Sequence, residues 1–198
     1  RWAAALLWSI WALVVLAAAR PQHVGDPLAL PMSGRDLLLA VDLSGSMEEE
    51  DFEINGTRVN RLEATQIVAD EFIERRVGDR VGLILFGREA YLQTPLTFDR
   101  ETVRTLLLES AIGLAGKETA IGDAIGLAIK RLQDSDGSRI LILMTDGANT
   151  AGEIEPLKAA QLAASRGLKI YTIGIGADQM VRNSFFGTRR INPSQELD

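Results

Sequence analysis

The sequence contains no cysteine and a single histidine, and both scarcities narrow the chemistry that it can support. Without cysteine there is no disulfide, no thiol nucleophile and no cysteine-ligated zinc. The histidine, His23, lies in a proline-containing stretch, where an exposed linker residue is the simplest interpretation. Catalytic triads that depend on histidine are therefore disfavoured.

Basic charge is also scarce. The 198 residues carry a formal charge of −6, and residues 36–198 carry −8, because the first 35 residues contain three arginines and one aspartate. An acidic domain without a basic stripe argues against nucleic acid as a partner. No Gly-x-x-x-x-Gly-Lys-Ser/Thr run occurs, which argues against a Walker-type nucleotide site. The length suffices for one domain with a full core and some additional segments.

Charge is missing altogether from Trp2 to Ala19, between Arg1 and Arg20. A helix over this stretch would be roughly 27 Å long, close to the roughly 30 Å hydrocarbon core of a bilayer. All three tryptophans fall within it. A signal peptide, suggested by the small residues 17–19, and a buried helix are the alternatives. We predict a transmembrane helix over residues 1–20, and expect an upstream piece because the chain opens on arginine.

Residues 21–35 contain three prolines and predict a linker. Strand-like and helix-like segments then alternate as far as Gly176. Strands that are continuously apolar are buried on both faces, so the pattern predicts an α/β fold with a doubly wound, mostly parallel sheet. The predicted strands are 37–41, 81–86, 90–92, 140–144 and 169–175, and the predicted helices begin after Asn60 or span 100–108, 121–132 and 156–165.

Two helices carry further local signals. Asn60 followed by Glu63 predicts a capping box, and the apolar face of that helix is expected at Thr65, Val68, Ala69, Phe72 and Ile73. In the helix 121–132, two glycines reduce helix propensity. We expect Gly122 and Gly126 to let this helix lie close against the sheet.

The most informative stretch is Asp42-Leu43-Ser44-Gly45-Ser46-Met47, which directly follows the first predicted strand. A carboxylate and two hydroxyls at alternate positions can direct several oxygens to one point, as Mg²⁺ requires. The alternative is a loop in which these side chains only cap backbone amides. Four acidic residues follow, and we expect 48–51 to be a solvated loop.

Two further loops favour the metal site over the capped loop. Ligands bind at the carboxyl ends of strands in such sheets, and Asp146 follows the predicted strand 140–144 as Asp42 follows the first strand. Neighbouring parallel strands lie about 4.8 Å apart, so the two carboxylates could share one cation. Thr119 precedes a helix and could add a hydroxyl or act simply as its N-cap.

Asp42, Ser44, Ser46, Thr119 and Asp146 fill, in order, the metal-ion-dependent adhesion site of von Willebrand factor A (VWA) domains, which this chain resembles. The stretch Gly78–Gly87 and the run from Met144 to Thr150 resemble more closely the bacterial aerotolerance (Bat) family, in particular BatA-like proteins. The resemblance covers nearly the whole chain. It implies that residues 36–198 form a VWA domain that is truncated at its C-terminal end.

The resemblance also implies how the site works. Ser44, Ser46 and Thr119 would contact Mg²⁺ or Mn²⁺ directly, while Asp42 and Asp146 would act through waters or hydroxyls. A cation with so little direct anionic charge would bind an Asp or Glu carboxylate of a protein partner. The implied partners are a MoxR-type AAA+ ATPase and other Bat proteins. The implied location is the bacterial inner membrane, and the resemblance does not determine on which side of it the soluble domain lies.

Two other functions remain open at this stage. A haloacid-dehalogenase-type phosphohydrolase also places an aspartate and Mg²⁺ after its first strand, but it needs a second aspartate where this chain has Ser44. The second alternative is a structural scaffold with a vestigial metal site.

Overall fold

The computed structural model describes residues 1–19, 34–54, 56–133, 135, 137–176, 180–184 and 187–191. The chain divides into two units, Arg1–Pro31 and Met32–Asp198, which are described separately. Of the predicted linker, only Gly34 and Arg35 are among the described residues, so the linker remains a prediction.

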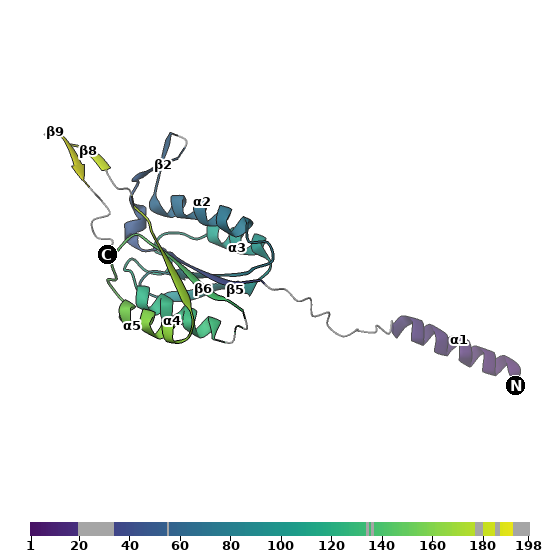
Figure 1. Ribbon diagram of the computed structural model, residues 1–198. Coiled ribbons are helices and arrows are strands. Elements are labelled where there is room, and N and C mark those ends of the chain that lie inside the picture. The colour runs from purple at the N-terminus through teal and green to yellow at the C-terminus, as the bar shows by residue number, and fades with distance from the viewer. Residues whose placement is uncertain are drawn as a thin grey trace. The chain divides into compact units, whose positions relative to one another are not determined.

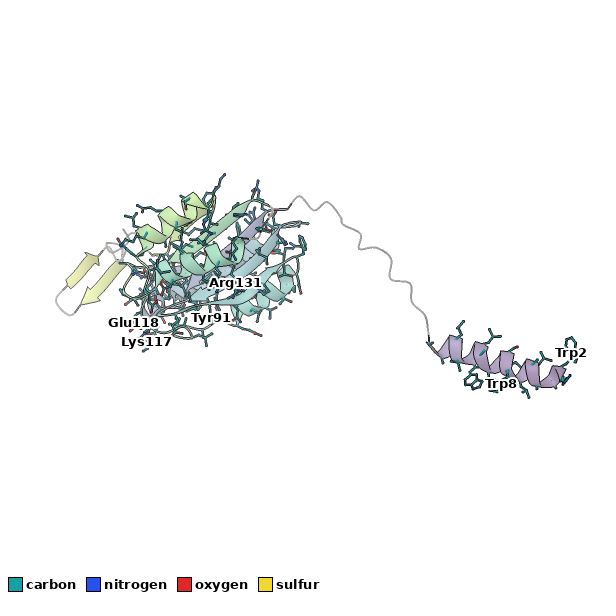
Figure 2. The ribbon with its side chains drawn as sticks, turned by 90° about the horizontal axis from the view of Figure 1, so that it is seen from below. Trp2, Trp8, Tyr91, Lys117, Glu118 and Arg131 are labelled. Carbon is teal, nitrogen blue, oxygen red and sulfur yellow. The ribbon has the colours of Figure 1, made fainter. Side chains whose placement is uncertain are left out.

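The first unit contains helix α1, Trp2–Ala19, over the stretch predicted to span a membrane. The helix is long and apolar enough to cross a bilayer, and none of its residues is buried. Figure 2 shows Trp2 and Trp8 projecting from it. The rings of Trp8 and Trp11 meet edge to face, with their centroids 5.8 Å apart.

The second unit is built on a five-stranded sheet with the order β5-β4-β1-β6-β7. Strands β4, β1, β6 and β7 are parallel, and β5 runs antiparallel to β4 at one edge. The predicted mostly parallel, doubly wound sheet is therefore confirmed. The strands are β1 Asp36–Asp42, β4 Arg80–Phe86, β5 Ala90–Thr97, β6 Arg139–Thr145 and β7 Lys169–Gly174.

Two helices cover each face of this sheet, with α2 and α3 on one side and α4 and α5 on the other (Figure 1). The alternation of side chains along β1 separates the two cores. Leu38 and Ala40 pack with α4 and α5, while Leu39 and Val41 pack with α2 and α3. The helices are α2 Arg61–Glu74, α3 Arg100–Leu108, α4 Ile121–Leu132 and α5 Pro156–Ser165.

Short elements that the sequence patterns did not predict complete the unit. A 3₁₀ turn, η1, spans Gly45–Glu48, and the hairpin β2–β3, Phe52–Ile54 with Thr57–Val59, follows it. A second hairpin pairs β8, Met180–Ser184, with β9, Gly187–Ile191. The first hairpin joins η1 to α2 and so belongs to the surroundings of the predicted metal site.

Helix α2 begins as predicted, but its buried face is shifted. The side chain of Asn60 accepts from the backbone N–H of Glu63, and the Glu63 side chain accepts from the backbone N–H of Asn60. The prediction that Val68 lies on the apolar face is wrong, because this residue is 55% exposed. The buried positions are instead Arg61, Leu62, Ala64, Thr65, Gln66, Ala69 and Ile73.

The glycines of α4 serve a contact other than the expected one with the sheet. A Cβ on Gly122 would lie 1.8 Å from the backbone oxygen of Ile154, in the loop before α5. A Cβ on Gly126 would meet only the end of the Ile154 side chain, Cδ1, at 2.8 Å. The close approach is therefore between α4 and the α5 loop backbone, and only Gly122 requires it.

We expect Gly122→Ala to lower the free energy of unfolding by about 1–3 kcal/mol, because backbone must move to admit the methyl group. The gain in helix propensity, about 1 kcal/mol, is too small to offset this. Gly126→Ala is the matched control and should be neutral or stabilising by up to about 1 kcal/mol. Urea unfolding of both variants tests the pair, and equal losses would contradict the assignment of the close contact to Gly122.

Candidate metal centre

The two predicted carboxylates lie at the ends of adjacent strands, at one edge of the sheet. Strand β1 ends at Asp42 and β6 ends at Thr145, and Val41 of β1 pairs with Met144 of β6. Asp146 therefore follows β6 at the same edge at which β1 ends. We call this edge, where the parallel strands end, the carboxyl edge.

Asp42 is fully buried, and both of its oxygens accept hydrogen bonds from protein groups. Its Oδ1 accepts from the backbone N–H of Ser44 at 2.8 Å, and its Oδ2 accepts from the Thr145 hydroxyl at 2.6 Å. Burial raises the pKa of Asp42 to about 6, against the lowering effect of these hydrogen bonds. The carboxylate is thus held in a fixed orientation under a desolvation penalty.

Ser44, Ser46 and Asp146 form a connected chain of oxygens. The hydroxyls of Ser44 and Ser46 lie 3.0 Å apart, and the Ser46 hydroxyl donates to Asp146 Oδ1 at 2.6 Å. Because Ser46 gives its only proton to Asp146, the Ser44 hydroxyl is the donor to Ser46, and one lone pair of the Ser46 oxygen remains available. Ser46 is exposed, whereas Ser44 and Asp146 are buried. The site is therefore open to solvent on the side of Ser46.

Thr119 lies in a loop that packs against the same motif. The backbone N–H of Gly45 donates to the carbonyl of Lys117 at 2.9 Å, which joins the two loops. The interpretation of Thr119 as the N-cap of α4 is wrong. The N-cap is Ala120, and the backbone N–H of Ile121 donates to the Asn149 side chain. Thr119 is buried, and its hydroxyl makes no hydrogen bond with any residue in the described parts of the chain.

Arg61, the first residue of α2, is a member of this site that the sequence patterns did not predict. Its guanidinium is buried and donates to Asp146 Oδ2 at 2.8 Å and to Asp51 Oδ2 at 2.8 and 3.1 Å. Burial acts to lower the pKa of Arg61, but the hydrogen bonds to Asp51 and Asp146 outweigh it and raise that pKa. One available signal was its position, because a cation in the first turn opposes the helix dipole and calls for an acidic partner.

The acidic stretch 48–51 is only partly the solvated loop that we expected. Glu48, Glu49 and Glu50 are exposed, but the side chain of Asp51 is fully buried against Arg61. Asp51 therefore contributes to the support of the site, through Arg61.

The donor set suits a hard divalent cation. All candidate ligand atoms are oxygens, as Mg²⁺ and Mn²⁺ prefer. Each oxygen of Asp42 and of Asp146 already accepts a hydrogen bond from the protein. Within the described part of the chain, no three His, Cys, Asp or Glu side chains gather into a metal-binding cluster. The hydroxyls of Ser44 and Ser46 lie beside these two carboxylates, and Thr119 lies in the adjoining loop.

Comparison with known proteins agrees with this geometry. Residues 36–184 match the von Willebrand factor type A domain. A protein of Borreliella burgdorferi described as uncharacterized is 31% identical over 168 residues, which cover 84% of this chain. This chain spans about half of that relative, 48% of its length.

Solved structures extend the comparison. An uncharacterized membrane-spanning protein of Vibrio fischeri is 54% identical, with a TM-score of 0.50 over 83% of this chain and 82% of that one. An aerotolerance-related membrane protein of Bacteroides fragilis is 26% identical, with a TM-score of 0.67 over 80% of this chain and 82% of that one. Proximal thread matrix protein 1 of the mussel byssus, solved with a zinc-occupied MIDAS motif (the metal-ion-dependent adhesion site), shares the fold at 20% identity and a TM-score of 0.60, over 73% of this chain and 38% of that one.

Proposed function

Because this chain belongs to the von Willebrand factor type A domain family, and its neighbours include aerotolerance-related membrane proteins, we propose that it is a membrane-anchored interaction module. In this proposal residues 1–20 anchor the chain, residues 21–35 link it, and residues 36–198 bind a partner through a divalent cation. The observation that supports it best is the cluster of Ser44 and Ser46 hydroxyls beside two carboxylates whose oxygens are all hydrogen-bonded.

The side chains would divide the work as follows. Ser44, Ser46 and Thr119 would bind Mg²⁺ or Mn²⁺ through their hydroxyls, and Asp42 and Asp146 would act through water or through those hydroxyls. Arg61 compensates the charge of Asp146. When bound, the cation supplies a positive centre on the open side of the site, beside Ser46, where an Asp or Glu carboxylate of a partner can complete its shell.

The metal part of this proposal predicts a large effect of one hydroxyl. We expect Ser44→Ala to weaken Mn²⁺ and Mg²⁺ binding by at least roughly tenfold, as losses of metal-site interactions do. Ser165→Ala, at the end of α5 and exposed, is the matched control and should bind as the parent does. Isothermal titration calorimetry measures both. Unchanged affinity in Ser44→Ala would remove the basis of the proposal.

The identity of the partner is the finer part of the proposal. We infer a BatA-like role at the bacterial inner membrane, with a MoxR-type AAA+ ATPase and other Bat proteins as partners. Crosslinking pull-downs from native membranes, in Mg²⁺ and in EDTA, test this with the parent and Ser44→Ala chains. Partners captured equally under all four conditions would favour a scaffold with a vestigial metal site.

We also infer that the chain is not an enzyme. The haloacid-dehalogenase alternative needs an accessible nucleophile, whereas Asp42 is fully buried and both of its oxygens are occupied. The position two residues later is Ser44, which cannot replace the acid–base carboxylate of that mechanism. Phosphatase turnover that disappears in Asp42→Asn would overturn this inference.

A further inference from the structure

A cavity lies at the opposite edge of the sheet, where the parallel strands begin. Its volume is about 500 Å³. We call the edge of the sheet where the parallel strands begin the N-terminal edge. The strand register brings two of the cations of the cavity together. Arg139 begins β6 opposite Asp36 of β1, and the next residue of β6, Ile140, is opposite Lys169, which begins β7. The residues that line the cavity and matter here are Arg35, Ser135, Ser138, Arg139, Arg166 and Lys169.

The four cations of this cavity form no ion pair with any described carboxylate, in contrast to arginines such as Arg80 and Arg104. Arg80 pairs with Asp36, and Arg104 pairs with Asp70 and Glu101. Asp79 accepts from the backbone N–H of Arg35, not from its guanidinium.

Arg139 is held in place by neutral groups. Its guanidinium donates to the carbonyls of Ser135 and Arg166. The charge of this group is therefore fixed at the cavity but not neutralised there.

The two edges of the domain differ in the sign of the charge that they carry. The loops and helix starts of the carboxyl edge carry most of its acidic residues, among them the stretch 48–51 beside the metal site. Figure 2 shows Lys117 and Glu118 at that end, away from Arg131 near the end of α4. The four cations of the cavity lie at the N-terminal edge, where the nearby Asp36 is paired with Arg80 and the four positive charges would attract an anion.

We propose that this cavity binds the phosphate groups of anionic phospholipids. The guanidinium groups of Arg35, Arg139 and Arg166 and the ammonium group of Lys169 suit phosphate oxygens. The lipid source rests on the membrane anchor of the proposed function. Arg35 follows the end of α1 by sixteen residues, so the chain cannot separate them by more than roughly 58 Å. A tether of that reach keeps the headgroups at high effective concentration.

The absence of cysteine makes the test direct. Ser138→Cys is exposed at the cavity and gives one site for a fluorophore in the full chain. The labelled chain is placed in nanodiscs of phosphatidylcholine, with or without phosphatidylglycerol, that contain a headgroup spin-labelled lipid. We expect strong quenching with phosphatidylglycerol, which high salt reverses, and little quenching in phosphatidylcholine alone.

Matched variants assign the effect to the cavity. Arg166→Gln with Lys169→Gln removes two cations whose side chains make no described contact, and should shift the equilibrium away from the lipid by roughly fivefold per charge. Lys117→Gln with Lys158→Gln removes two cations from the carboxyl edge and should change nothing.

Each other outcome overturns the proposal. Equal quenching in both lipids, or parent-like quenching in the Arg166→Gln, Lys169→Gln chain, excludes lipid recognition by the cavity. Binding of inorganic phosphate to the parent chain, measured by calorimetry, together with an unquenched label in the phosphatidylglycerol discs, identifies a free anion as the ligand. A chain that does not co-purify with the discs contradicts the anchor itself, whereas an incorporated chain with an unquenched label contradicts only the lipid site.

Discussion

Replacing Arg61 by methionine should lower the free energy of unfolding by about 3–5 kcal/mol, the cost of leaving buried charge without its partner. The guanidinium is the described cation that contacts Asp146, and it also bonds Asp51, whose side chain is fully buried. Methionine keeps the volume of the side-chain stem, so the loss reports charge rather than packing. Urea unfolding in EDTA at neutral pH measures it.

Arg104→Met is the matched control for this substitution. Arg104 also makes a two-point bond to an aspartate, Asp70, but its side chain is 25% exposed and that of Asp70 is 22% exposed. Exposed pairs contribute about 1 kcal/mol or less. Similar losses in both variants would contradict the role assigned to Arg61. Added Mn²⁺ should restore part of the stability of Arg61→Met, because a bound cation stabilises the folded state and also compensates Asp146.

Replacing Asp42 by asparagine should stabilise the metal-free protein at pH 7, by up to about 3 kcal/mol. The pKa of Asp42 is 3.8 in the unfolded reference and about 6 in the folded protein, so the folded state holds the proton more tightly. The free energy of unfolding in EDTA should therefore fall as the pH rises from about 4 to about 6. Asparagine removes this penalty because it is neutral, and its amide can still bond Ser44 and Thr145.

The response to a metal ion distinguishes Asp42→Asn from a substitution that stabilises the domain without affecting the metal site. Mn²⁺ should stabilise the parent chain at pH 7 and leave Asp42→Asn nearly unchanged. Asp36→Asn is a control with the opposite sign. Burial acts to raise the pKa of Asp36, but hydrogen bonds from Arg80 and Ser135 outweigh it and lower that pKa. The contribution of Asp36 to the free energy of unfolding is therefore lost on acidification. We expect Asp36→Asn to destabilise at pH 7, and a fall in stability for Asp42→Asn in EDTA would contradict the assigned pKa.

Local sequence signals predicted the frame of this domain well. The apolar runs of β1, β4 and β6 and the cap at Asn60 depend on neighbours in the chain, and the structure has them where they were expected. Parallel pairing then determined that Asp42 and Asp146 would share an edge, because both follow strand ends. These features follow from periodicity and hydrogen-bond geometry, which a single sequence records.

The features that were missed depend on contacts between distant residues. Arg61 meets Asp146 across 85 positions of sequence, and Gly122 meets the backbone of Ile154 in another loop. The cap of α4 comes from Asn149 rather than from Thr119 beside it. Val68 satisfies the helical period but is exposed in the folded domain, so periodicity alone could not exclude it.

The hydrogen bonds that hold Asp42 and Asp146 have a consequence for how fast the site can work. Every oxygen of both carboxylates has a protein donor, so neither side chain needs to reorder when a cation enters. The exposed Ser46 leaves one side of the site open for entry. The slow step of binding should then be the loss of water from the ion, which Mg²⁺ gives up reluctantly. Mn²⁺ should accordingly exchange faster than Mg²⁺ at the same site, while the positions of the protein side chains should differ little between the Mn²⁺-bound and the Mg²⁺-bound states.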